Sequence, residues 1–162
     1  MTTKADFTPE EWTELLRAPI IAGMVITMAS PAIGDSVKES MAVAKTLTNA
    51  AMQADGEGLY VEWVSEYKDK EKVKQAQPKF EHTDINTVIA KAVDDVRTVA
   101  ALLDEKADAD EAAPIKQLIY DTAVASAEAA KEGDFMGIGG VRVNDAEKAA
   151  LADLASILNV SV

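Results

Sequence analysis

The sequence predicts an all-α protein, a single-domain antiparallel helical bundle of about five to six helices that spans residues 1–162. Apolar residues recur at intervals of three and four along most of the chain, which is the spacing of one face of an α-helix. Proline, glycine and capping residues divide this pattern into segments of helical length, and alternating strand patterns are almost absent. Because no internal repeat or low-complexity linker divides the chain, one domain is the simplest organisation.

The composition is that of a chain that folds without covalent cross-links. Hydrophobic residues make up 48% of the sequence and charged residues 27%, which is close to ordinary globular usage. The chain has no cysteine, which excludes disulfides, thiolate zinc sites, iron–sulfur clusters and cysteine nucleophiles. A net charge of −12 repels phosphate groups, so we expect neither nucleic acid nor an anionic membrane surface as a partner. The first residues lack the pattern of a signal peptide, and we expect a soluble, cytoplasmic protein.

The first expected helix is also the most apolar one. Thr8 is a capping residue and Pro9 fits the first helical turn. Residues 18–34 carry no charge, but this length only reaches the lower limit of about 17 residues for a membrane span. Prolines and glycines shorten the strongly apolar part to about residues 20–29. We therefore expect a buried central helix, with a segment that inserts into a membrane or a partner as the alternative, and we expect Pro19 to kink or divide the helix.

The second and third helices follow after residue 34. The second is expected to begin at Asp35 or Ser36, to run to about residue 54 and to end at the glycines of residues 56–58. The third is expected over about residues 59–75, with a solvated second half. One stripe of the second helix is expected to be buried, and it comprises Val37, Met41, Ala44, Leu47 and Ala51.

Three more helices complete the expected bundle. A helix over about residues 83–106 has the clearest amphipathic pattern, which favours it as the central packing partner. A helix over about residues 108–132 is rich in alanine in its second half, where small side chains let a neighbouring helix approach closely. The last helix begins after Asn144, whose side chain forms a capping box with Glu147.

Polar residues between the helices give few candidates for chemistry. His82 is the only histidine of the chain, so paired histidine motifs for di-iron or zinc sites are excluded. A solvated residue at a helix entry is the simpler interpretation of His82. The carboxylates of residues 104–111 do not have the spacing of a calcium-binding loop. We therefore expect no catalytic residue, no metal site and no cofactor.

A glycine-rich loop is the one weak candidate for binding an anion. Gly137, Gly139 and Gly140 are followed by Arg142, and backbone amides in such loops can surround a negatively charged group. The spacing matches neither of the two common nucleotide-binding loops. A tight turn is the simpler interpretation, and the neighbouring Phe135 is expected to fold back or to offer a contact surface.

Two segments at opposite ends of the chain carry a resemblance to known proteins. The first comprises Pro9, Glu10, Glu11, Trp12, Leu15, Leu16, Pro19, Gly23, Ser30 and Pro31. The second comprises Gly137, Ile138, Gly139, Gly140, Val141, Val143, Ala146, Glu147 and Leu151. Together they resemble a family of uncharacterised bacterial helical proteins, and the second is also similar to the last helix of tellurite-resistance B-like domains. Neither resemblance implies an activity or a site residue.

The leading hypothesis for function is a non-enzymatic soluble binding or assembly protein that uses an apolar helix surface. A homodimer is its simplest form, and another protein partner is the variant. The candidate contact residues are large and apolar, and they comprise Trp12, Ile20, Met24 and Phe135. The alternative hypothesis is a small-ligand or metal-binding helical bundle, with the ligand between helices or at the glycine loop.

Overall fold

A computed structural model describes residues 1–30, 36–81, 84–131 and 143–161. Within these residues it contains seven α-helices and two short 3-10 helices and has no strand, so the predicted all-α fold is confirmed. The α-helices are α1 (Pro9–Ala29), α2 (Ser36–Gln53), α3 (Leu59–Ser65), α4 (Lys70–Gln75), α5 (Ile85–Lys106), α6 (Ala109–Lys131) and α7 (Asp145–Leu158). The 3-10 helices are η1 (Lys4–Asp6) and η2 (Glu66–Lys68).

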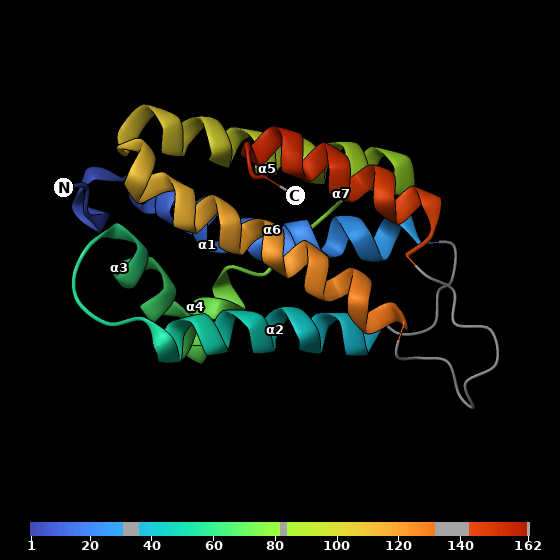
Figure 1. Ribbon diagram of the computed structural model, residues 1–162, viewed down its shortest axis with the longest axis horizontal. Coiled ribbons are helices and arrows are strands. Elements are labelled where there is room, and N and C mark those ends of the chain that lie inside the picture. Colours follow the sequence, from blue (N-terminus) through green and yellow to red (C-terminus); the bar gives the residue numbers. More distant parts are fainter. Residues whose placement is uncertain (31–35, 82–83, 132–142, 162) are drawn as a thin grey trace.

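Helices α1 and α6 form the centre of the bundle. Figure 1 shows them between α5 and α7 on one side and α2 on the other. In the described residues α1 is the only helix long and apolar enough to cross a membrane, and 61% of its most apolar stretch is buried inside the bundle. The expected burial of this helix is therefore confirmed. The expectation that residues 83–106 form the central packing partner is wrong, because α5 packs on the outside of α1.

Helix α1 continues through Pro19 instead of dividing there. Proline has no N–H to donate to the carbonyl four residues earlier, which belongs to Leu15. The buried indole Nε1 of Trp63 donates to that carbonyl at 3.2 Å, and the Tyr67 hydroxyl donates to the Leu16 carbonyl at 2.9 Å. Burial raises the pKa of Tyr67 well above its ordinary value, so the hydroxyl stays a donor. Side chains from α3 and η2 thus stabilise α1 at its proline.

The two central helices run in the same direction, which departs from the predicted antiparallel arrangement, whereas α5 runs antiparallel to α1 because its last residue, Lys106, meets Glu11 at the start of α1. The Thr122 hydroxyl of α6 donates to the Pro19 carbonyl at 2.8 Å, and the Ser126 hydroxyl donates to the Gly23 carbonyl at 3.1 Å. Both bonds join residues 103 positions apart, which is the relation expected of parallel helices. A Cβ at Gly23 would lie 2.5 Å from Cγ2 of Val43, so this glycine also lets α2 approach closely.

The helix expected over residues 59–75 is broken into α3, η2 and α4. The break lies at Asp69, whose extended backbone ends η2 and whose side chain accepts from the amides of Glu71 at 2.9 Å and Lys72 at 3.4 Å. An aspartate in this position starts a new helix, because it satisfies amides that have no partner within the helix. The sequence pattern instead predicted that Asp69 lies on the solvated half of one continuous helix.

The buried stripe of α2 differs from the expected one. Val37 is 71% exposed, Met41 is 66% exposed and Ala44 is exposed as well, so the prediction that these three residues face the core is wrong. The helix carries apolar residues on two adjacent faces that share Leu47 and Ala51. Only the face that contains Val43 packs against α1, at the position where Gly23 has no side chain. The residues that are buried on α2 are Glu39, Val43, Leu47 and Ala51.

Candidate functional site

One face of α1 lines two cavities that lie on either side of α4. The first, which we call the α1–α2 cavity, has a volume of about 130 Å³. It is lined by Ile20, Gly23, Met24, Thr27, Glu39, Ser40, Val43, Ala44, Leu47, Val73 and Gln77. The second, which we call the N-terminal cavity, has a volume of about 290 Å³. It is lined by Lys4, Phe7, Thr8, Pro9, Trp12, Thr13, Leu16, Glu66, Lys72, Gln75 and Ala76.

The α1–α2 cavity is mostly apolar, and its hydroxyl groups are already engaged. Its walls come from side chains of α1, α2 and α4 such as Ile20, Met24 and Val73. The Thr27 hydroxyl lies 3.3 Å from the Gly23 carbonyl and 3.3 Å from the Ser126 hydroxyl of α6, and the Ser40 hydroxyl donates to a carbonyl one turn earlier in α2 at 2.7 Å. Both hydroxyl oxygens can still accept a hydrogen bond, since a hydroxyl has one donor and two acceptor positions.

Glu39 is the unusual residue of this cavity. It is only 4% exposed, and its Oε2 atom has no hydrogen-bond partner among the described residues. A buried carboxylate without a partner costs folding free energy, so proteins rarely keep one. Glu39 lies in the first turn of α2, where the helix dipole favours a negative charge. The cavity therefore contains an acceptor that none of the described residues satisfies.

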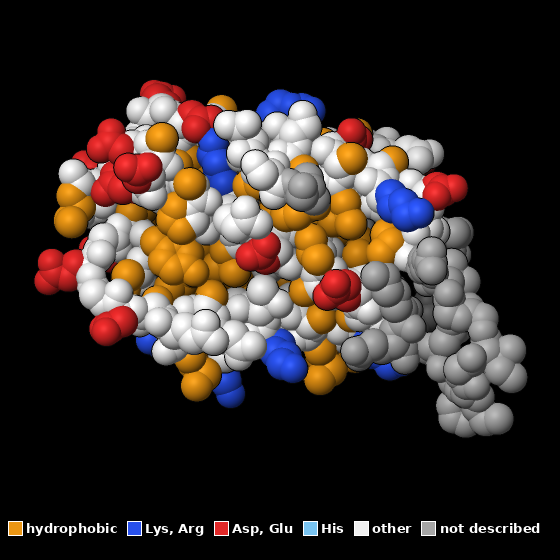
Figure 2. Space-filling model, viewed as in Figure 1, with side chains coloured by type: hydrophobic (Ala, Val, Ile, Leu, Met, Phe, Trp, Pro, Cys, Tyr) orange, Lys and Arg blue, Asp and Glu red, His pale blue; other side chains and the backbone are white. Residues whose placement is uncertain are grey.

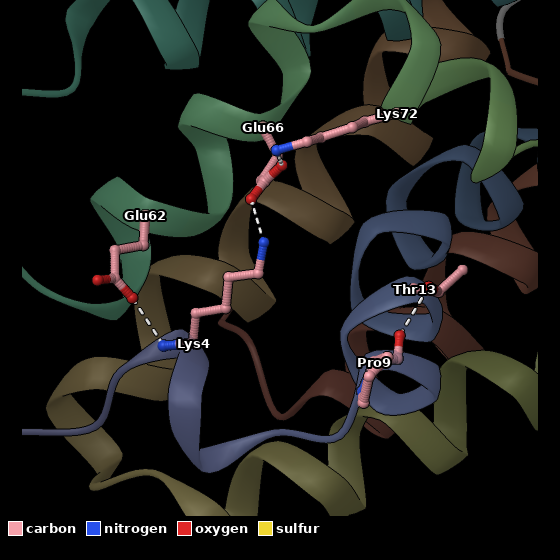
Figure 3. Close-up of polar contacts among 6 residues, drawn as sticks. All are labelled: Lys4, Pro9, Thr13, Glu62, Glu66 and Lys72. Carbon is pink, nitrogen blue, oxygen red and sulfur yellow. Dashed lines mark hydrogen bonds and ion pairs between the residues drawn. The ribbon is translucent and has the colours of Figure 1, made fainter.

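The N-terminal cavity has polar groups that pair with each other at its edge. Figure 3 shows Lys4 and Lys72 approaching Glu66 from opposite sides, with Lys4 Nζ 2.6 Å from Oε1 of Glu66. Burial disfavours the charged form of Glu66, but the ion pairs with the two lysines outweigh it and lower the pKa of this carboxyl. The backbone N–H of Lys4 also donates to Glu62 at 2.7 Å (Figure 3). These contacts hold the chain's first residues against α3 and η2.

Helix α2 also presents exposed apolar side chains, which we call the α2 stripe. Val37, Met41 and Met52 are 71%, 66% and 74% exposed, and Figure 2 shows hydrophobic side chains protruding at the edge of the molecule formed by α2. Ser40 and Ala44 lie on the same helix and line the α1–α2 cavity. The stripe therefore borders the mouth of that cavity.

The structure brings three of the candidate contact residues onto one face of α1. Trp12 is buried and lines the N-terminal cavity, and its Nε1 has no hydrogen-bond partner in the described part of the chain. Ile20 and Met24 are half-buried and line the α1–α2 cavity. The other candidates lie outside the described residues, and they comprise His82, Phe135, Gly137, Gly139, Gly140 and Arg142.

Sequence reasoning missed Glu39, although a signal for it exists. Glu39, Val43, Leu47 and Ala51 follow one another at intervals of four residues, which places them on one helix face. Reading that face as the buried one would have identified a buried carboxylate. The periodicity does not decide between this face and the neighbouring one with Val37 and Met41, because both contain apolar residues.

The carboxylates near the start of α6 serve the fold. Asp104 pairs with Lys116 Nζ at 2.5 Å, and Glu111 accepts from the Thr2 backbone N–H at 2.9 Å. Over residues 1–30, 36–81, 84–131 and 143–161, no group of three or more histidine or carboxylate side chains could hold a metal ion. A metal function therefore has no support in this part of the molecule.

No protein-family model, curated protein or solved structure matches this chain. A helical bundle does not by itself indicate a function, because one fold can carry many functions. The two cavities and the α2 stripe are therefore the features from which a function can be inferred.

Proposed function

We propose that this chain is a non-enzymatic binding protein that holds a small ligand in the α1–α2 cavity. The observation that carries the proposal is the buried carboxylate of Glu39, which lines a mostly apolar cavity and has an oxygen without a described partner. Ligand sites typically combine apolar walls with a few polar groups that fix orientation. This favours the small-ligand hypothesis over assembly.

The polar groups of the cavity favour binding over catalysis. A nucleophilic hydroxyl needs a base beside it to remove its proton. The Thr27 and Ser40 hydroxyls instead donate to backbone carbonyls of their own helices, and Oε2 of Glu39 is hydrogen-bonded to neither of them. The cavity can therefore position a ligand, but it lacks an activated nucleophile among the described residues that line it.

The size of the cavity limits the ligand. A dry cavity of about 150 Å³ holds a benzene molecule, and the volume here is about 130 Å³. The buried part of the ligand is therefore a short alkyl chain or a single ring. Met24 can adapt to its shape, because the methionine side chain is flexible and polarisable.

The proposal is tested by blocking the cavity from α2. Ala44 is exposed and lines the cavity, so Ala44→Met places a larger side chain at its mouth. Thr48→Met adds the same side chain one turn along α2, outside the cavity, and is the matched control. We expect fragments such as butanol or butylamine to shift the methyl resonances of Ile20 and Val43 in the wild type and in Thr48→Met only. Equal shifts in Ala44→Met, or none in the wild type, contradict the proposal.

A second candidate function is self-assembly through the α2 stripe. The sequence led to the same hypothesis of assembly through an apolar helix surface, but it placed that surface on the first helix. It is favoured by the exposure of Val37, Met41 and Met52. The only acidic residue of α2 is Glu39, which is buried. In a two-fold dimer, the α2 surfaces of the two copies face each other. Because these surfaces carry little of the chain's negative charge, repulsion between the copies is small there.

Light scattering of suitable variants tests this second candidate. Met41→Glu places a charge in the α2 stripe, whereas Asn49→Glu adds the same charge to an exposed position of α2 outside the stripe. We expect a dimer in the wild type and in Asn49→Glu, and a monomer in Met41→Glu, because a buried unpaired charge disfavours the contact. A wild-type chain that is monomeric at all concentrations would exclude this function.

A further inference from the structure

We infer that the ligand of the α1–α2 cavity is a small primary alkylammonium compound whose charged group pairs with Glu39. The inference rests on the proposed function, because it names the ligand class of the same cavity. It draws on the balance of donors and acceptors around the cavity, the position of Glu39 and the cavity's volume.

The cavity supplies acceptors and lacks a positive charge. Its described lining contains the Glu39 carboxylate and no lysine, arginine or histidine. The Ser40 hydroxyl donates to a carbonyl at 2.7 Å. The Thr27 hydroxyl lies 3.3 Å from the Gly23 carbonyl and 3.3 Å from the Ser126 hydroxyl, so each of the two oxygens keeps a lone pair for a ligand. A carboxylate or phosphate ligand would meet a like charge here, and such a contact is unfavourable.

A primary ammonium group matches these acceptors. It has three N–H donors and no acceptor, and its pairing with a carboxylate gives a strong, charge-assisted hydrogen bond. Glu39 can receive one donor, and the hydroxyl oxygens of Thr27 and Ser40 are the other acceptors that line the cavity. A neutral alcohol supplies one donor and leaves the carboxylate charge unpaired. A quaternary ammonium group supplies no donor at all.

The apolar walls set the rest of the ligand. Ile20, Met24, Val43, Leu47 and Val73 line the cavity, and its volume of about 130 Å³ is close to that of a cavity that holds benzene. An unbranched chain of about four carbons therefore fits beside the carboxylate. We take n-butylammonium as the probe, with n-butanol and butyrate as the neutral and anionic compounds of equal chain length.

The experiment measures binding of the three probes by calorimetry or by NMR titration at pH 7. For the wild type we expect n-butylammonium to bind about tenfold or more tightly than n-butanol, because a hydrogen bond to a charged group is worth at least that factor. Butyrate should bind most weakly. In Glu39→Gln the preference for the ammonium over the alcohol should disappear, while n-butanol still binds.

A matched variant distinguishes pairing of the ammonium group with Glu39 from a general attraction of cations to an acidic protein. Glu105 is exposed on α5 and does not line the cavity, so Glu105→Gln removes the same charge elsewhere. We expect Glu105→Gln to keep the wild-type preference for n-butylammonium. An equal loss in both variants, or equal binding of the amine and the alcohol by the wild type, overturns the inference.

The free protein gives a second readout that a purely structural role of Glu39 would not produce. Because the carboxylate is buried without a described partner, Glu39→Gln should raise the melting temperature of the unliganded protein while it lowers affinity for the amine. A structural glutamate would lower the melting temperature when changed. If n-butanol binds in the cavity but the amine is not preferred, this inference fails and the proposed function stands. If none of the probes binds there, both fail.

Discussion

Single residues decide how closely the helices of this bundle approach one another, and Gly23 is the clearest case. An alanine in a helix interior is favoured over glycine by about 1 kcal/mol. A Cβ at Gly23 would, however, lie 2.5 Å from Val43 Cγ2, and overpacking of this kind costs about 1–3 kcal/mol. Gly23→Ala should therefore lower the free energy of unfolding by about 1 kcal/mol. Urea denaturation of the variant measures this loss.

The Val43→Ala background tests whether the clash is the cause. With the Cγ atoms of Val43 removed, Gly23→Ala should gain stability by about 1 kcal/mol, because only the helix preference is left. A double-mutant cycle then gives a coupling between the two positions. An equal loss in both backgrounds would assign the effect to another contact.

Trp63 has a different role, since it satisfies a carbonyl that Pro19 leaves without a helical donor. Its Nε1 donates to the Leu15 carbonyl at 3.2 Å. Trp63→Phe should lower the free energy of unfolding by about 2–4 kcal/mol, through an unpaired buried carbonyl and a loss of packing. In a Pro19→Ala background the new amide can bond Leu15, so the same change should cost less. Chemical denaturation of the four proteins checks this, and equal costs would contradict it.

At the scale of elements, Lys106 and two carboxylates join the first residues of the chain and the start of α1 to α5 and α6. Lys106 Nζ of α5 donates to Glu11 at 2.6 Å and to the Asp6 carbonyl at 3.0 Å. The hydrogen bond from Lys106 is the main cause that lowers the pKa of Glu11, and hydrogen bonds from Thr2 lower the pKa of Glu111. Two carboxylates at this end are therefore held in their charged form.

These lowered pKa values predict a loss of stability in acid. A group whose pKa is lower in the folded state stabilises the protein above its ordinary value, which is 4.5 for Glu11, and this contribution is lost as the pH falls through the folded pKa. The melting temperature should therefore fall below about pH 4.5. Lys106→Met should lower it at pH 7 and have little effect near pH 3, as thermal unfolding at a series of pH values can show.

Lys148→Met is the matched control for this prediction. Lys148 lies 3.6 Å from Asp145, whose side chain is fully exposed, and exposed pairs of this kind contribute little. The difference between Lys148→Met and the wild type should therefore stay small and independent of pH. A pH-dependent difference as large as that of Lys106→Met would show that the effect follows net charge instead of the contacts of α1.

The elements also differ in how well the sequence predicts them. Helix starts with capping residues are predicted correctly at Thr8 and Asn144, because their side-chain bonds to the amides of Glu11 and Glu147 are local. The break at Asp69 also depends on local side-chain bonds, but it was not predicted. Lysines and acidic residues alternate around Asp69, so this segment has no apolar periodicity whose interruption would mark the end of a helix. Glu39 is buried because the face of α2 that carries it packs against α1 at Gly23. Contacts between segments that are distant in the sequence leave no local pattern, so the sequence does not show which of the two faces of α2 is buried.

At the scale of the whole molecule, the negative charge is distributed unevenly. Residues 36–79 contain seven acidic and seven basic residues, so the remaining residues carry the whole net charge of −12. The face that holds the α1–α2 cavity and the α2 stripe is built largely from this neutral segment. Cations are therefore attracted in a general way to the rest of the surface, and this attraction is separate from pairing with Glu39. The binding experiment needs a control variant that removes a charge far from the cavity for this reason.

The excess charge makes a final prediction about salt. With 28 acidic and 16 basic residues, at least twelve carboxylates have no basic residue to pair with, so repulsion outweighs the exposed ion pairs. Salt shortens the screening length from about 30 Å at 0.01 M to about 8 Å at 0.15 M. The melting temperature at pH 7 should therefore rise with added sodium chloride.

The same measurement near the isoelectric point, about pH 4.5, is the control for this last prediction. Repulsion is nearly absent there, so salt should leave the melting temperature unchanged or lower it by screening the ion pairs that remain. A rise of equal size at both pH values would mean that salt acts on apolar burial instead. A fall at pH 7 would mean that ion pairs such as Lys4 with Glu66 contribute more to stability than the net charge takes away.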